Sequence, residues 1–159
     1  MDTKINKTNA ARLLDQAKIK YELIAYQFDE SDLSAPHVAA ALGEPIEQVF
    51  KTLVLAGDKS GYFVCVVPGN CEINLKKAAK IFANKSCDLI AQKDLLPLTG
   101  YIRGGCSPIG MKKLFPTCID ETCLLYDYIF VSAGQRGLQF KIGTDDLIAI
   151  TQAKTADIV

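Results

Sequence analysis

A single lysine begins one of the most apolar segments of the chain, at a position where its charge could do chemistry. Lys51 follows Phe50 and precedes the apolar run from Thr52 to Leu55, a pattern that predicts a central strand. Lysine is depleted in such strands and is costly to bury without a partner. Lys51 therefore either keeps its ammonium group in water at the exposed start of the strand or points into a cleft. In a cleft, a charge held on a rigid strand would suit a carbonyl or phosphate oxygen.

A glycine-rich segment is the second candidate. Residues 100–110 contain four glycines and one proline, which excludes regular secondary structure. At Gly104 and Gly105 a ligand can approach the backbone, and successive N–H groups can bind a developing oxyanion. A tight structural loop is the alternative. The length of the segment and its Ser107-Pro108 flank favour a site.

Two lysine clusters could contact phosphates. Lysine in the first turn of a helix opposes the helix dipole, and like charges four residues apart repel. The stability of the protein therefore does not require lysines at these positions. The alternative for each lysine is an ordinary solvated position in a neutral protein. The clusters are formed by Lys76, Lys77 and Lys80 on a predicted helix and by Lys112 and Lys113 after the glycine-rich segment.

Few side chains in the sequence could act as a base or a metal ligand. His37 is the single histidine, and its place near the start of a short helix favours an ordinary polar role. Cys106 could be a nucleophile, but no histidine stands near it in sequence, so a space-filling thiol is the preferred interpretation. The six cysteines are not spaced for zinc or for a disulfide framework. We therefore expect no metal and no cofactor.

The composition limits the classes of protein to consider. The 159 residues are 49% hydrophobic and 23% charged, which excludes a disordered chain and suits a single domain over residues 1–159. The net charge of zero excludes binding to nucleic acid through bulk positive charge. No signal peptide or membrane-spanning run is evident, so we expect a cytoplasmic protein without a membrane partner.

The hydrophobic pattern predicts an α+β domain with a mixed sheet, because strands outnumber helices without a regular alternation. Thr8 and Asn74 are the expected caps of two helices. The expected buried face of the first is formed by Ala10, Leu13, Leu14 and Ala17, and that of the second by Leu75, Ala78, Ala79 and Phe82. A third helix is expected between Ser34 and Gly43. The other predicted helices cover residues 91–96 and 144–152, and the predicted strands cover residues 21–27, 50–57, 61–68, 86–90, 116–120, 128–132 and 138–142.

Several segments together resemble a known family. The segments VFKTLVL, NLKKAAK, TGYIRGGCSPIGMKK and IFVSAGQRGL occur in this order, and ADI follows near the end. They resemble the YbaK/EbsC family of aminoacyl-tRNA deacylases, which is related to the editing insertion domain of bacterial prolyl-tRNA synthetase. The resemblance covers nearly the whole chain. It implies a single domain with a barrel-like, mostly antiparallel mixed sheet, flanking helices and a small pocket.

The resemblance also implies an activity and a set of residues. The family removes a wrong amino acid, usually cysteine, from tRNA(Pro), and a prolyl-tRNA synthetase is the implied partner. Its functional lysine corresponds to Lys51, and its backbone-donor loop to Gly104 and Gly105. The implied substrate-binding residues are Tyr26, Ser107, Pro108, Ser132 and Gly134.

Such an activity would explain the missing base. The thiol of a cysteine esterified to tRNA can itself attack the ester carbonyl and form a thiolactone, so the protein has only to orient the ester and stabilise the oxyanion. Two alternatives remain at this stage: a deacylase for another small amino acid such as alanine, and a non-catalytic module that binds tRNA or protein.

Four positions depart from the family pattern. Cys106 stands where relatives usually have an aliphatic residue, and Gln139 where some have an acidic one. These two would alter the shape or polarity of the pocket. Met111 and Gln135 replace a common glutamine and a frequent lysine, which reduces the polar or basic surface expected near tRNA.

Overall fold

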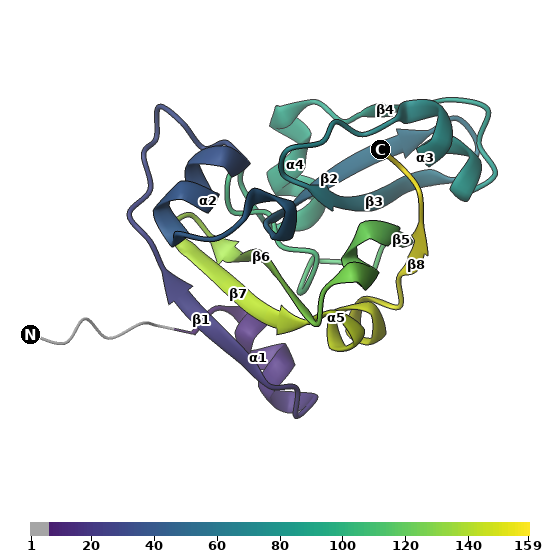
Figure 1. Ribbon diagram of the computed structural model, residues 1–159. Coiled ribbons are helices and arrows are strands. Elements are labelled where there is room, and N and C mark those ends of the chain that lie inside the picture. Colours follow the sequence, from purple (N-terminus) through teal and green to yellow (C-terminus); the bar gives the residue numbers. More distant parts are fainter. Residues whose placement is uncertain (1–6) are drawn as a thin grey trace, which may run out of the picture.

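The structure is a computed structural model that describes residues 7–159, and its strands form two separate sheets (Figure 1). The first sheet has three antiparallel strands in the order β1-β7-β6, and the second has five strands in the order β4-β2-β3-β5-β8. The strands are β1 (Tyr21–Ala25), β2 (Phe50–Gly57), β3 (Gly61–Pro68), β4 (Cys87–Leu89), β5 (Thr117–Asp120), β6 (Tyr128–Gln135), β7 (Leu138–Gly143) and β8 (Lys154–Ala156).

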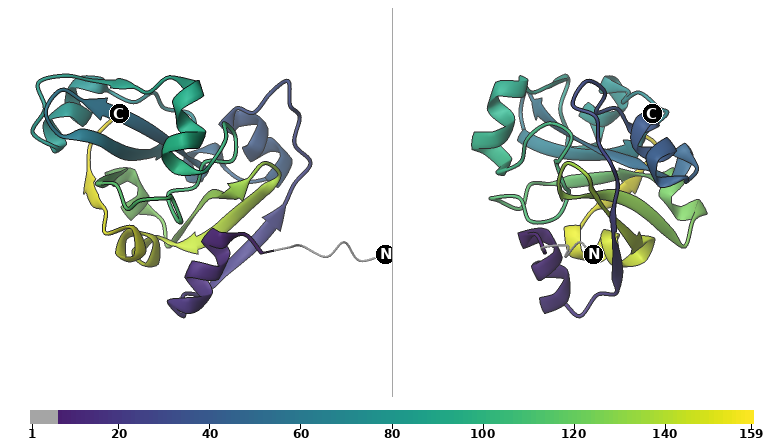
Figure 2. Two further views of the ribbon diagram at one scale, coloured as in Figure 1. Left: turned by 180° about the vertical axis from the view of Figure 1, so that it is seen from behind. Right: turned by 90° about the vertical axis from the view of Figure 1, so that its left-hand side faces the viewer.

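The α+β class with a mixed, mostly antiparallel sheet is confirmed, but the barrel-like form is not. β3, β5 and β8 pair in parallel, and the remaining strand pairs are antiparallel. A single parallel bridge between Val49 and Phe130 connects the two sheets. Because one bridge does not continue the ladder, the described strands form two layers rather than a closed barrel (Figure 2).

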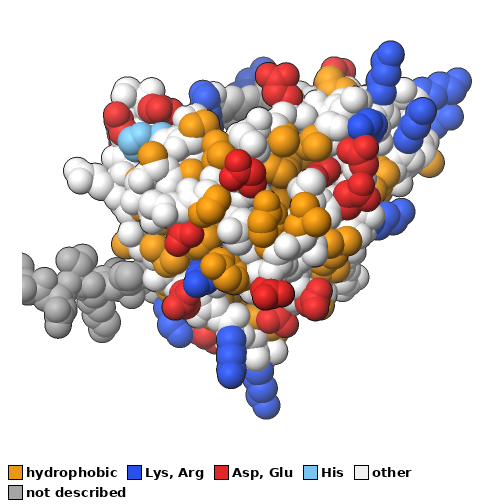
Figure 3. Space-filling view, viewed as in Figure 1, with side chains coloured by type: hydrophobic (Ala, Val, Ile, Leu, Met, Phe, Trp, Pro, Cys, Tyr) orange, Lys and Arg blue, Asp and Glu red, His pale blue; other side chains and the backbone are white. Residues whose placement is uncertain are grey.

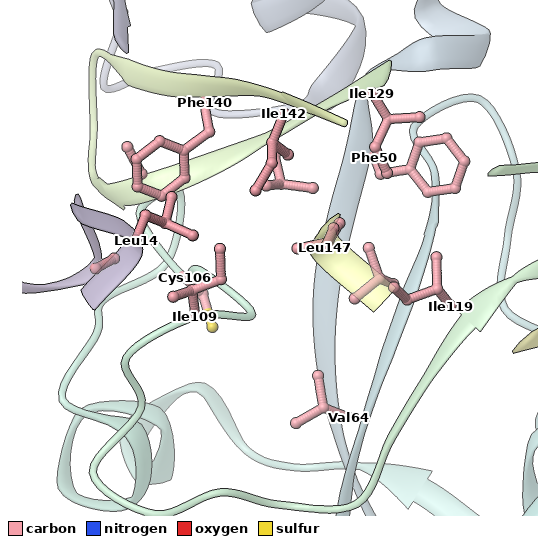
Figure 4. Packing of buried hydrophobic residues seen from close by; sticks show 14 of the residues in the cluster. Leu14, Phe50, Val64, Cys106, Ile109, Ile119, Ile129, Phe140, Ile142 and Leu147 are labelled. Carbon is pink, nitrogen blue, oxygen red and sulfur yellow. The ribbon is translucent and has the colours of Figure 1, made fainter. Parts of the chain in front are cut away.

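Three apolar clusters hold the layers together. The largest lies between the inner faces of the two sheets and includes Phe50, Phe140 and Leu147 (Figure 4). A second cluster lies between the five-stranded sheet and α3 (Leu75–Ile81). In the third, Val49 and Phe130 pack with α2 (Ala35–Leu42) against the outer face of the three-stranded sheet. The start of β2 therefore lies where both sheets and α2 meet.

The helices begin where the sequence predicts, although one leucine on each of two predicted buried faces is exposed. Thr8 caps α1 (Asn9–Gln16) by accepting the Ala11 N–H at 3.2 Å, and Asn74 caps α3 by accepting the Lys77 N–H at 3.0 Å. Leu13 and Leu75 are 42% and 38% exposed, so their expected burial is wrong. Ala10, Ala11 and Leu14 are the buried residues of α1, and Ala78 and Ala79 those of α3. The small alanine side chains let each helix approach the sheet closely. The remaining helices are α4 (Gln92–Thr99), α5 (Thr144–Thr151) and the short 3₁₀ helices η1 (Ile46–Gln48) and η2 (Glu121–Leu125).

Two elements have no clear sequence signal. The strand β8 is three residues long and exists only through its parallel pairing with β5, which is distant in sequence. The 3₁₀ helix η2 begins where Asp120 accepts hydrogen bonds from the backbone and hydroxyl of Thr122. Among residues 7–159, no helix has both the length and the apolar character to cross a membrane.

Candidate functional site

A cleft of about 340 Å³ opens where the two sheets meet α2 and the glycine-rich segment. The volume lies within the range of small-molecule sites. Residues 49–53 form one wall, along a part of β2 that has no β4 neighbour, because β4 pairs only with Leu55–Gly57. The other lining residues are Leu33, Ser34, Ala35, Pro36, Val38, Gly69, Arg103, Gly104, Cys106, Ser132 and Gln139.

Lys51 belongs to this cleft because of the bridge between the sheets. Val49 and Phe130 are paired and pack in the same cluster. Two residues further along each strand, Lys51 and Ser132 share that face because side chains alternate along a strand. Ser132 in turn pairs with Gln139 of β7. Three polar side chains from three strands thus line one cleft.

The cleft carries positive charge and no lining carboxylate. Its ionisable cations are Lys51 and Arg103, and no Asp or Glu belongs to its lining. No ion pair within residues 7–159 involves Lys51. An unpaired ammonium on a rigid strand is available to bind a carbonyl or phosphate oxygen.

The glycine-rich segment contributes one free backbone donor at Gly104. Its φ of +83° favours glycine, and the residue lines the cleft. Its N–H donates to no acceptor in the described part of the chain. The Gly105 N–H, in contrast, donates to the Ile102 carbonyl at 2.9 Å and closes a turn. Of the two amides expected to bind an oxyanion, only that of Gly104 is therefore available in this structure.

Gly105 instead holds the segment against the hairpin between β6 and β7. A Cβ at this position would lie 3.0 Å from the Gln135 Cα, so a side chain would push the two backbones apart. A second contact is made nearby, where the Arg136 Nε donates to the Arg103 carbonyl at 2.9 Å. The hairpin thus determines where Gly104 stands relative to the cleft.

Four other candidates do not line the cleft. Ser107 is fully buried, and its hydroxyl accepts the Ile109 N–H at 3.2 Å. Pro108 lines a separate groove, together with Leu13 and Phe115. Gly134 donates its N–H to the Ser132 hydroxyl at 3.2 Å, and so orients a group that does line the cleft. Tyr26 packs against the cluster of α2 and is not part of the lining.

The five candidate tRNA-contacting lysines all lie outside the cleft lining, and three of them have structural contacts. Lys77 donates to Asp157 at 2.7 Å, Lys112 donates to the Pro97 carbonyl at 3.2 Å, and Lys113 lies 5.7 Å from the centre of the Phe115 ring. On the face shown in Figure 3, basic side chains stand mainly at the margin, interspersed with acidic ones. Lys76 and Lys80 lie exposed on α3.

Cys106 and His37 have surroundings that do not favour nucleophilic catalysis. Cys106 lies beside Ile109 among apolar side chains (Figure 4), and burial raises the pKa of its thiol to about 12. The thiol is therefore protonated near neutral pH. The His37 Nδ1 lies 4.0 Å from Asp32, and His37 does not line the cleft. Within residues 7–159, no group of three or more His, Cys, Asp and Glu side chains is placed to hold a metal ion.

The structure adds lining residues that the sequence does not single out as site residues. Thr52 follows Lys51 and has a buried hydroxyl without a hydrogen-bond partner. Arg103 lies inside the glycine-rich segment, but nothing in its spacing distinguishes it. The sequence from Ser34 to Pro36 predicts the start of a helix, but it does not predict which residues lie next to that helix in the fold. Only proximity in the fold identifies these residues.

Comparison with known proteins identifies the class that this fold and cleft define. Residues 30–150 match the family described as "Aminoacyl-tRNA editing domain", and the chain belongs to this family. The family resemblance inferred from the sequence segments is confirmed.

Individual relatives agree with this assignment. The chain is 47% identical over 152 residues to the "Putative Cys-tRNA(Pro)/Cys-tRNA(Cys) deacylase EbsC" of Enterococcus faecalis, covering 96% of this chain and 93% of the relative. It is 34% identical over 81 residues to the proline–tRNA ligase of Fervidobacterium nodosum, covering 51% of this chain and 14% of that enzyme. Among solved structures, that of "a putative trans-editing enzyme for prolyl tRNA synthetase" matches with a TM-score of 0.80 and 26% identity, covering 96% of this chain and 98% of the other.

Proposed function

We propose that this protein is a trans-editing deacylase that removes cysteine from mischarged tRNA(Pro). The observation that carries the proposal is the 47% identity to the EbsC relative over nearly the full length of both chains. The cleft supports it, because its lining contains both Lys51 and Gly104, whose N–H makes no backbone hydrogen bond among the described residues. Both suit the oxygen of an ester carbonyl as it gains negative charge.

The reaction needs no base from the cleft. The thiol sulfur of the esterified cysteine attacks the ester carbonyl carbon, and the carbonyl oxygen becomes an oxyanion. Lys51 and the Gly104 N–H stabilise that oxyanion. Collapse breaks the bond between the carbonyl carbon and the ribose oxygen, which takes up the proton that the thiol gives up. The products are a thiolactone and a free tRNA end.

The enzyme would work beside a prolyl-tRNA synthetase in the cytoplasm. The net charge of zero gives the chain little general attraction for a polyanion. Half of the chain is similar to a small part of proline–tRNA ligases, so its cleft would serve the tRNA that those enzymes charge. The synthetase would then supply most of the nucleic-acid contacts.

The test is deacylation of a panel of charged tRNAs. Purified protein is incubated with Cys-tRNA(Pro), Ala-tRNA(Pro) and Pro-tRNA(Pro), and loss of each aminoacyl bond is followed. We expect fast loss of cysteine, slow loss of alanine and no loss of proline. Retention of all three amino acids, with measurable tRNA binding, would instead identify a non-catalytic module.

A further inference from the structure

Gln139 is a buried side chain whose amide oxygen makes no hydrogen bond. It is 4% exposed, lies on β7 between Ile24 and Ser132, and lines the cleft. Its Oε1 is buried and has no hydrogen-bond partner within residues 7–159. Buried amides are nearly always paired, because removal from water without a partner is costly. Rotation of the amide by 180° exchanges Oε1 with Nε2, so the unpaired oxygen can be turned toward a ligand in the cleft.

The other polar groups of the cleft are mainly donors. Lys51 and Arg103 have side chains that only donate, and the Gly104 N–H is also a donor. The Ser132 hydroxyl already accepts the Gly134 N–H. Gln139 Oε1 and the hydroxyl of Thr52 are the buried side-chain oxygens of the cleft without a partner. An acceptor in such surroundings suits the part of a substrate that donates.

The aminoacyl group itself has one strong donor, its α-amino group, and the ribose adds the hydroxyl next to the ester. The carbonyl and bridging oxygens of the ester only accept, and these match the donors of the cleft. We propose that Gln139 Oε1 accepts a hydrogen bond from the α-amino group of the esterified amino acid. Gln139 is then a specificity-determining residue that selects aminoacyl groups with a free amine. This inference rests on the deacylase activity proposed above.

A neutral acceptor also fits the charges of the cleft. With Lys51 and Arg103 in the lining and no carboxylate, the cleft offers no counter-ion for an ammonium group. An amide oxygen accepts a hydrogen bond from the amine whether or not the amine is protonated. Gln139 can therefore bind the amino group and leave Lys51 free for the carbonyl oxygen.

The experiment compares two substrates that differ only in the amine. Cys-tRNA(Pro) is compared with mercaptopropionyl-tRNA(Pro), which keeps the thiol and the ester but lacks the amino group. We expect the wild type to prefer Cys-tRNA(Pro) by about ten- to a hundredfold in kcat/KM, the range that one hydrogen bond to a ligand supports. Gln139→Leu should bring the ratio close to one by losing rate on Cys-tRNA(Pro) alone. Gln139→Glu should keep the preference, because carboxylate oxygens also accept.

Controls separate recognition from folding and from the proposed activity. Gln27→Leu changes an exposed glutamine outside the cleft and should keep the wild-type ratio. A wild type that cleaves both substrates equally would overturn the inference, whatever the variants do. So would a Gln139→Leu variant that melts like the wild type and keeps its ratio. A wild type that releases no cysteine at all overturns the proposed function together with this inference.

Discussion

The carboxylate of Asp120 at the end of β5 and the amide of Gln139 on β7 are both buried, yet only the carboxylate is hydrogen-bonded. Asp120 is 0% exposed, and its oxygens accept from the Ile158 N–H at 3.0 Å and from both the N–H and the hydroxyl of Thr122. Asn84 is satisfied in the same way by the hairpin turn after β2. Gln139 and Thr52 in the cleft have no such partners.

This difference in hydrogen bonding distinguishes buried polar groups that stabilise the fold from those that line the cleft. Where a buried polar group holds chain segments together, the protein satisfies it completely, because an unpaired group would lower stability. Of the three buried side-chain atoms without a partner in residues 7–159, Gln139 Oε1 and the Thr52 hydroxyl belong to residues that line the cleft, where a bound ligand can pair with them, and His37 Nε2 lies outside the lining. Substitutions in the two regions should therefore affect different quantities: stability in the first and activity in the second.

Lys51→Ala should have the largest effect of all, and on activity alone. Loss of a charged oxyanion donor is expected to lower kcat for Cys-tRNA(Pro) by about a hundred- to a thousandfold. The thermal midpoint should stay at the wild-type value, because Lys51 forms no ion pair among the described residues. Lys59→Ala, in the turn between β2 and β3, is the matched control and should be fully active. Full activity of Lys51→Ala would remove this lysine from the mechanism.

Asp120→Ala should lower stability and leave the activity of the folded protein nearly unchanged. The Ile158 N–H and the Thr122 N–H would lose their acceptor, and Ile158 is fully buried. We expect the free energy of unfolding to fall by about 3 kcal/mol, the sum of two unsatisfied donors. Urea unfolding measures this change. At a temperature where the variant remains folded, kcat should stay near that of the wild type, and a selective loss of activity would contradict the comparison.

Thr52→Val is the sharper test, since its expected effect on stability is small and of the opposite sign. The Thr52 hydroxyl is buried without a partner, so its removal deletes an unpaired group. The free energy of unfolding should stay the same or rise by up to about 1 kcal/mol. A loss comparable to that of Asp120→Ala would show that the hydroxyl serves the scaffold. Urea unfolding of both variants under the same conditions decides between these outcomes.

The thiol of Cys106 should show the smallest effect. Because burial raises its pKa to about 12, nearly all of it is protonated at pH 8 and reacts slowly. Cys71 is more exposed, and iodoacetamide should modify it first. Mass spectrometry of digested protein gives the order of modification. Rapid alkylation of Cys106 in the folded protein, with a matching loss of deacylation activity, would instead support Cys106 as a catalytic nucleophile.

Much of the local structure follows from the sequence. The bounds of β2 and β3 agree with the prediction, because two apolar runs flank a short polar turn rich in glycine. Thr8, Asn74 and Gly43 mark helix ends through their own side chains or backbone angles. The lysine at the start of β2 and the unusual glycine-rich segment are also evident, since a charge beside a core strand and clustered glycines are local signals.

The tertiary structure alone decides how these pieces make a cleft. The Val49–Phe130 bridge aligns Lys51 with Ser132, and the β6–β7 register then brings in Gln139. The turn at Gly105 engages one of the two amides expected to be free. Pairing across a long stretch of sequence and the satisfaction of each polar atom depend on neighbours in space. Sequence patterns determine which residues form strands and helices, whereas packing determines which polar groups remain available to a substrate.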